Sequence, residues 1–117
     1  MHSRFILVAT ILSFSIISGC STTSEADYNA GITVVKSNPS ARKEISRKCI
    51  AEVKAQSLLD QKNLAAVMNV SLASYPKVFC QRLIGAMLNG RLTHADFKAM
   101  SGLNGDYSKL IKIVQGR

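Results

Sequence analysis

From about residue 40 onward, apolar side chains recur at the spacing of an amphipathic helix. Between there and Asp60, apolar residues fall on one side of a helical wheel, and Lys43, Arg47 and Lys54 fall on the opposite side. The apolar side consists of Ala41, Ile45, Cys49, Val53 and Leu59. Pro39 suits the first position of a helix, and Ser37 or Asn38 can cap the free amides before it. The pattern predicts a helix that begins near residue 40.

Two further helices are predicted before Gly90. One runs from about Asn63 to Ala73. The polar stretch 60–63 before this helix contains no helix breaker, so the helix is either separate or a continuation of the first one. Pro76 then opens the next helix, which ends near Asn89 with Gly90 as its C′ residue. The apolar stripe of the first of these helices consists of Leu64, Ala65, Val67, Met68 and Leu72, and that of the second consists of Phe79, Cys80, Leu83, Ile84 and Met87.

The last part of the chain predicts two short helices. Thr93 is suited to the N-cap position, with Asp96 in the capping-box position. Leu92 and Phe97 occupy the two positions of a hydrophobic staple around this cap. Gly102 and Gly105 end this helix, and Asp106 can cap the final one. The stripe of the final helix consists of Tyr107, Leu110, Ile111 and Val114. Residues 40–117 are therefore expected to form an all-α bundle of four or five short helices.

The stretch from residue 83 to 100 is locally similar to the SHOCT module, a short bacterial helix-turn-helix. The matching residues are Leu83, Leu88, Gly90, Leu92, Thr93, Asp96 and Phe97. The chain departs from the usual pattern by carrying Cys80 and by continuing into another helix. The resemblance implies a role in interaction rather than in catalysis.

The N-terminal residues have the order of an export signal. A short basic start containing Arg4 precedes the apolar stretch Phe5–Ile17, which is shorter than the roughly 20 residues that cross a bilayer. Ser18 and Gly19 follow, and then Cys20, an arrangement that resembles the lipobox of bacterial lipoproteins. The resemblance implies that residues 1–19 are removed and that Cys20 is acylated on its sulfur, as with palmitate, and becomes the mature N-terminus.

By the same resemblance, Ser21 after the cysteine favours the outer membrane, with the domain facing the periplasm or the cell surface. Residues 20–39 are rich in Ser, Thr, Asn and Ala and show no sustained helical period. We expect them to form a flexible tether of about 25 Å average span. Within it, Ile32–Val35 is a β-prone segment too short to found a sheet.

Cys49 and Cys80 remain after Cys20, and both lie in apolar stripes. An even pair in an exported domain of this size predicts a disulfide, which would stabilise the fold by roughly 3–4 kcal/mol. A metal site would need more ligands than these two cysteines and His94, and a redox-active pair would usually show C-x-x-C spacing. The disulfide is the favoured interpretation.

The chain is basic, with 15 Lys and Arg against 7 Asp and Glu and a formal net charge of +8. For an exported protein, the available anionic partners are phospholipid headgroups, lipopolysaccharide and other acidic envelope polymers, rather than nucleic acid. The candidate residues for contact with such a partner are Lys43, Arg47 and Lys54. The alternative is that this basic face only contacts solvent.

No motif in the sequence indicates a reaction. His94 is the one histidine after Cys20, and a surface or partly packed histidine is the expectation for it. Gly-rich phosphate loops, G-x-S-x-G and H-E-x-x-H do not occur. We therefore expect a non-enzymatic, cofactor-free lipoprotein that binds an envelope protein or an anionic envelope polymer. The alternative is a periplasmic inhibitor or an acid-stress chaperone.

Overall fold

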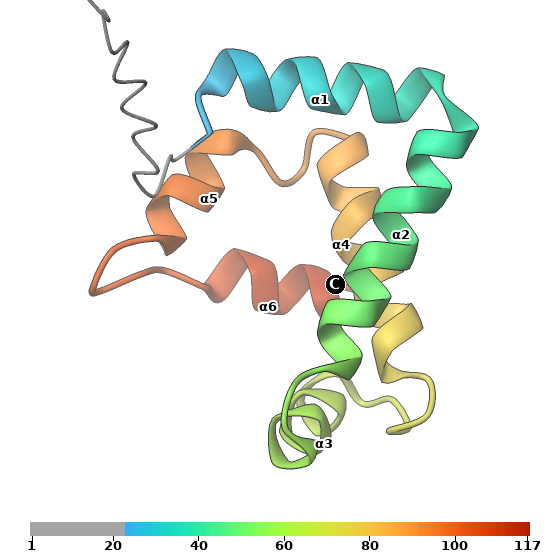
Figure 1. Ribbon diagram of the computed structural model, residues 1–117. Coiled ribbons are helices and arrows are strands. Elements are labelled where there is room, and N and C mark those ends of the chain that lie inside the picture. The colour runs from blue at the N-terminus through green and yellow to red at the C-terminus, as the bar shows by residue number, and fades with distance from the viewer. Residues whose placement is uncertain (1–22) are drawn as a thin grey trace, which may run out of the picture.

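The computed structural model describes residues 23–117, which form six α-helices and, within that range, no strand (Figure 1). In chain order the helices are α1 (Glu25–Ser37), α2 (Pro39–Lys54), α3 (Leu58–Met68), α4 (Tyr75–Leu88), α5 (His94–Met100) and α6 (Ser108–Val114). The all-helical prediction is confirmed. Five of the helices, α2 to α6, form the expected bundle, and α1 is an additional helix where a tether was expected.

The expectation of flexible coil before residue 40 is wrong for residues 25–37, which form α1. The Ser24 side chain caps the helix by accepting a hydrogen bond from the Asp27 amide at 3.1 Å. Tyr28, Ile32 and Val35, at positions i, i+4 and i+7, are its half-buried side chains. Packing of this stripe outweighs the β propensity of the segment 32–35, so that segment is helical as well.

The chain turns between α2 and α3 at residues 55–57, earlier than the sequence suggested, so the two helices are separate. Ser57 caps α3 by accepting from the Asp60 amide at 3.1 Å. This break changes the rotational phase of the residues beyond it. Leu59, expected on the inner side of the first helix, therefore lies in α3 and is 67% exposed.

The last helix buries Val114 and half-buries Leu110 as expected, but it buries Ile113 in place of Tyr107 and Ile111. Ile113 and Val114 are both 3% exposed, whereas Tyr107 and Ile111 lie at the surface. The reason is that α6 begins only at Ser108 and packs on α4 with its C-terminal end. Asn38 caps α2 through its side chain and Pro39 follows at the first helical position, as predicted.

Two clusters of buried side chains hold the helices together, and α4 contributes to both. The larger cluster joins α2, α3, α4 and α6, and its buried members are Val53, Ala65, Met68, Tyr75, Cys80, Ile84 and Val114. The smaller cluster joins α4, α5 and α6, and its buried members are Ala86, Leu92, Met100 and Ile113. Half-buried Leu110 packs against both clusters and so connects them.

The turn between α4 and α5 has the caps that the sequence predicts. Gly90 follows the end of α4 with φ of 79°, a left-handed conformation that glycine adopts without a steric penalty. Thr93 and Asp96 form a reciprocal capping box at the start of α5. Leu92, which precedes this cap, is 1% exposed, and half-buried Phe97 packs against the same cluster. These caps and contacts fix the direction in which α5 leaves α4.

Asp96 also joins α5 to α6, because its carboxylate accepts from Lys109 Nζ at 2.8 Å. The Lys109 hydrogen bond first, and the Thr93 backbone hydrogen bond next, lower the pKa of Asp96 below its ordinary value of 3.8. A lowered folded-state pKa adds stability that is present above the unfolded-state pKa and is lost as the pH falls through the folded-state pKa.

We therefore expect Asp96→Asn to lower the melting temperature at pH 7, because it removes the carboxylate that both helices use. As the pH falls through the lowered folded-state pKa, the wild-type carboxyl group is itself protonated, and the difference between the two proteins should shrink. Circular dichroism melts between pH 2 and pH 7 measure this difference. Lys109→Gln should reproduce part of the effect at pH 7. A difference in melting temperature that stays constant over this range would contradict the prediction.

Candidate functional site

A surface groove of about 490 Å³ lies among the N-terminal turn of α1, the C-terminal half of α4 and the length of α5. Its volume is within the range of small-ligand and side-chain binding pockets. Three of its residues, Tyr28, Met87 and Phe97, are large and carry mainly apolar surface. The complete lining is Thr23, Ser24, Tyr28, Met87, His94, Phe97, Lys98 and Ser101. We refer to this feature as the α1–α5 groove.

Tyr28 is the residue that attaches α1 to this site. Its hydroxyl donates a hydrogen bond to the carbonyl oxygen of Leu92 at 2.9 Å. Its ring is tilted against Phe97, with ring centroids 5.7 Å apart, and against His94, with centroids 6.0 Å apart. Burial, and to a lesser extent the nearby Asp96 carboxylate, raise the pKa of Tyr28. The hydroxyl therefore remains a protonated donor at neutral pH.

His94 holds the start of the described chain against α5. Its Nε2 lies 2.5 Å from the carbonyl oxygen of Thr23, which accepts the hydrogen bond. The imidazole is half-buried and forms one wall of the groove. Since this nitrogen and the Tyr28 hydroxyl both bond to backbone carbonyls, they serve to build the groove. Exposed Lys98 is the cationic group left at the rim.

This arrangement is suited to binding an apolar side chain that has an acidic or hydrogen-bonding group beside it. The aromatic and thioether side chains offer an apolar surface, and Lys98 offers a charge at the edge. The sequence indicates Phe97 through the hydrophobic staple after Thr93, but the tether expected at residues 20–39 leaves Tyr28 unidentified. The spacing of Tyr28, Ile32 and Val35 was the available signal.

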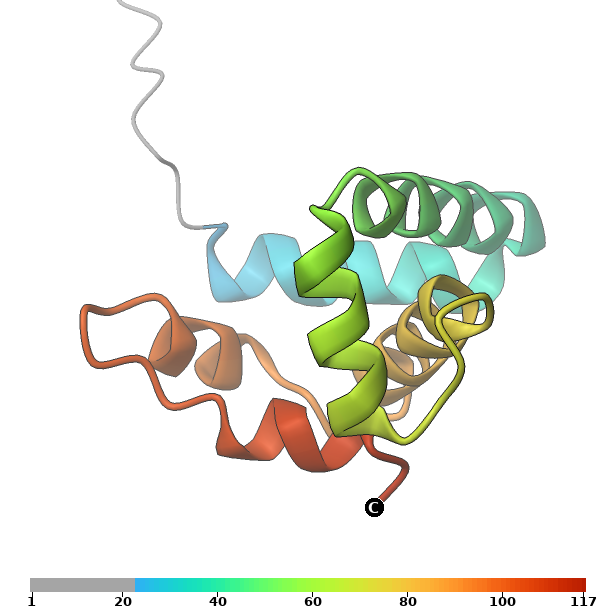
Figure 2. The same cartoon turned by 90° about the horizontal axis from the view of Figure 1, so that it is seen from below.

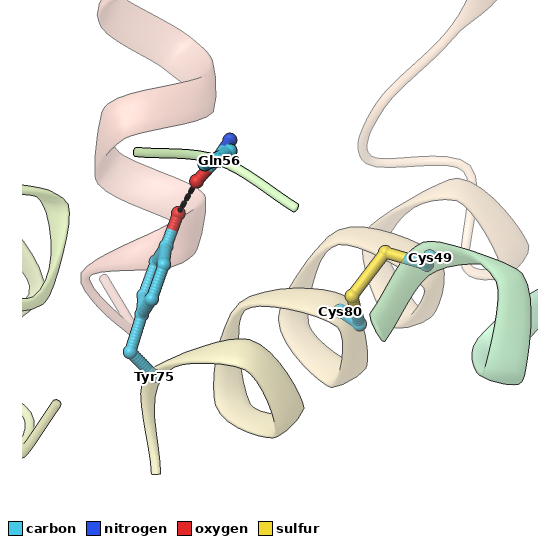
Figure 3. The surroundings of a disulfide bond; sticks show 4 residues. All are labelled: Cys49, Gln56, Tyr75 and Cys80. Atoms are coloured by element: carbon cyan, nitrogen blue, oxygen red, sulfur yellow. Dashed lines mark hydrogen bonds between the residues drawn. A yellow bond between two sulfur atoms is a disulfide. The ribbon is translucent and has the colours of Figure 1, made fainter. Parts of the chain in front are cut away.

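The predicted disulfide joins Cys49 of α2 to Cys80 of α4, with Cα atoms 5.9 Å apart (Figure 3). Cys80 is completely buried, and half-buried Cys49 packs against the larger cluster. Near the bridge, the buried Tyr75 donates from its hydroxyl to Gln56 Oε1 at 2.9 Å, which ties α4 to the turn before α3. The disulfide thus belongs to the core and does not line the groove.

Lys43, Arg47 and Lys54 are all exposed on α2, as the helical wheel predicts, and none of them lines the groove. Arg47 forms two hydrogen bonds to the carboxylate of Glu44, at 2.6 and 3.0 Å, one turn away on the same helix. Lys48 also approaches that carboxylate, at 4.0 Å. Glu44 therefore offsets part of the positive charge that α2 presents to solvent.

The predicted lipidation site, Cys20, lies outside the described residues. Within residues 23–117, no helix combines the length and the apolar character needed to cross a bilayer. In that same range, His, Cys, Asp and Glu side chains do not gather in groups of three or more that could hold a metal ion. In comparisons with family models, curated proteins and solved structures, the chain showed no significant match.

Proposed function

We propose that this chain is a lipid-anchored protein of the bacterial cell envelope, and that its helical domain binds a partner protein through the α1–α5 groove without catalysing a reaction. The proposed partner binding rests on the α1–α5 groove. It is open and partly aromatic, and its Tyr28 and His94 polar atoms already bond to backbone carbonyls. Aromatic anchors in a concave site are a common basis of protein recognition.

Two properties of the chain support the anchoring part of the proposal. The order of a basic start, an apolar stretch, Gly19 and Cys20 resembles a lipobox. The disulfide between Cys49 and Cys80 suits an exported domain, because disulfides persist in oxidising compartments. Two or more acyl chains on Cys20 would give a stable anchor, whereas a single chain binds membranes only marginally.

Anchoring is tested by metabolic labelling with a fatty acid in a bacterial host that processes lipoproteins. The wild-type chain should incorporate the label and shorten on processing, and Cys20→Ala should do neither. Cys49→Ala serves as the matched control, since it removes a different cysteine and should still be labelled. Label on Cys20→Ala protein, or normal processing of it, would contradict the proposed lipidation.

Partner binding is tested by replacing Lys98, at the rim of the groove, with a photo-crosslinking amino acid in cells. A single protein adduct, lost when Phe97→Ala is added, supports a dedicated partner. The control position is Lys62, which is exposed on α3, where no such adduct should form. Adducts to many proteins at low pH would favour the chaperone alternative. Binding abolished by changing Lys43, Arg47 and Lys54 to Gln, with no effect of Phe97→Ala, would favour an anionic polymer on α2.

A further inference from the structure

The folded domain begins closer in sequence to the proposed anchor, Cys20, than the tether expected at residues 20–39 would place it. Helix α1 begins at Glu25, and Thr23 already contacts His94 at the start of α5. Two residues, Ser21 and Thr22, separate Cys20 from Thr23, and the three Cα–Cα steps between them can span no more than about 11 Å. If Cys20 is lipidated, the start of α1 and the adjoining part of α5 are therefore held at the membrane surface, not at the end of a long tether.

A turn with an apolar tip lies at this same end of the molecule. Thr23 and Ser101 both line the α1–α5 groove, and Ser101 leads directly into the turn between Gly102 and Gly105. A hydrogen bond of 3.1 Å from the Gly105 amide to the Gly102 carbonyl oxygen closes this turn. Both views show the start of α1 and the α5–α6 loop at one end of the described chain, with α2 at the other (Figures 1 and 2).

The tip of this turn is Leu103, whose side chain is fully exposed and is the most exposed large apolar side chain of the described residues. Tyr107, at the end of the same loop, is 51% exposed. Exposed Lys98 lies one turn before the loop on α5. A leucine tip flanked by a tyrosine and a lysine matches the composition of membrane–water interfaces, where aromatic rings and the long stems of lysine are favoured.

The turn is also held firmly against the helix that carries it. The Asp106 amide donates to the carbonyl oxygen of Ala99 at 3.2 Å. A Cβ atom on Gly105 would lie 2.3 Å from the Met100 carbonyl oxygen, so the backbone packs too closely there for any other residue without a shift. Leu103 is therefore presented outward by a fixed backbone and not by a free loop.

We infer that the Gly102–Gly105 turn inserts Leu103 into the surface of the bilayer to which Cys20 anchors the chain, an inference that rests on the proposed lipidation. The contact is apolar, since the acidic side chains of Glu25 and Asp27 lie in the first turn of α1 at the same end and oppose any attraction to anionic headgroups. Insertion gives the domain one fixed orientation on the membrane.

The chain contains no tryptophan, so a single introduced tryptophan is the only such emitter and reports its own surroundings. The test uses the full chain with Leu103→Trp, expressed for processing and reconstituted in vesicles of phosphatidylethanolamine and phosphatidylglycerol. Leu59→Trp is the matched control, because Leu59 is also an exposed leucine but lies on α3, away from that end. Quenchers are brominated lipids within the bilayer and acrylamide in water.

For Leu103→Trp we expect blue-shifted emission and several-fold stronger quenching by brominated lipid than for Leu59→Trp, and the reverse order with acrylamide. The lipid quenching should persist in 1 M NaCl, since the contact is apolar. Equal quenching of the two variants in protein that floats with the vesicles overturns the inference and leaves lipidation standing. Protein that carries no fatty acid and does not float overturns the proposed lipidation, and the inference with it.

Discussion

Loss of the disulfide between Cys49 and Cys80 is expected to lower the melting temperature of the domain by more than about 12 °C. The bridge closes a loop over a sequence separation of 31 residues. In the chain-entropy description, such a loop stabilises by roughly 3–4 kcal/mol, and each kcal/mol corresponds to about 4–8 °C in a domain of this size. The bridge also lies in the larger cluster, so reduction would loosen the packing between α2 and α4.

The measurement compares thermal melts of oxidised protein, reduced protein and the Cys49→Ala/Cys80→Ala variant, all in a Cys20→Ser background that leaves two of the three cysteines. The denatured, non-reduced protein should contain no titratable thiol. The reduced protein and the double variant should melt at similar, lower temperatures. Two free thiols in the denatured, non-reduced protein, or an unchanged melting temperature after reduction, would refute a stabilising bridge.

The parts of the fold that the sequence predicted correctly are those with local signals. The turn from α4 to α5 is specified by Gly90, Thr93 and Asp96 within a few residues, and each of them occupies its expected capping position. The disulfide was predictable because Cys49 and Cys80 both belong to apolar stripes and so had to face the same interior. Neither prediction required knowledge of distant contacts.

Two of the errors concern helix starts that have a similar cap. Ser24 precedes Asp27 by three residues and Ser57 precedes Asp60 by three, which is the spacing that identified Thr93 and Asp96. The tether expected at residues 20–39 rested on their Ser, Thr, Asn and Ala content and on the lack of a sustained helical period, and it made no use of the Ser24 signal. The Ser57 signal was masked because the apolar stripe of α2 was extended through it to include Leu59.

The α1–α5 groove could not have been predicted from periodicity at all. Its geometry depends on the hydrogen bond from Tyr28 to Leu92, which joins residues 64 positions apart, and on the contact between His94 and Thr23. Such contacts are formed by tertiary packing, which no local pattern encodes. The groove is a consequence of α1 folding back onto α5, so the proposed partner binding depends on a helix that the sequence did not predict.

Replacement of Leu92 by alanine is expected to destabilise the domain by about 2–5 kcal/mol, the usual cost of this change in a packed core. Leu92 is 1% exposed and belongs to the smaller cluster, where its side chain packs with residues of α4, α5 and α6. Its carbonyl oxygen also accepts the Tyr28 hydroxyl. A cavity at this point would therefore loosen the attachment of α1 as well as the cluster, and amide hydrogen exchange should increase in α1 more than in α3.

The matched control is Leu103→Ala, which makes the same chemical change at a fully exposed position in the next loop. Without membrane present, that variant should unfold within about 0.5 kcal/mol of the wild-type protein, since it leaves no cavity. Urea unfolding of both variants and of the wild-type chain measures the difference directly. The contrast between these two leucines separates the roles assigned to them, because only Leu92 should affect folding and only Leu103 should affect contact with the bilayer. Equal destabilisation by the two substitutions would contradict both the packing of α1 onto α5 and the outward placement of the turn.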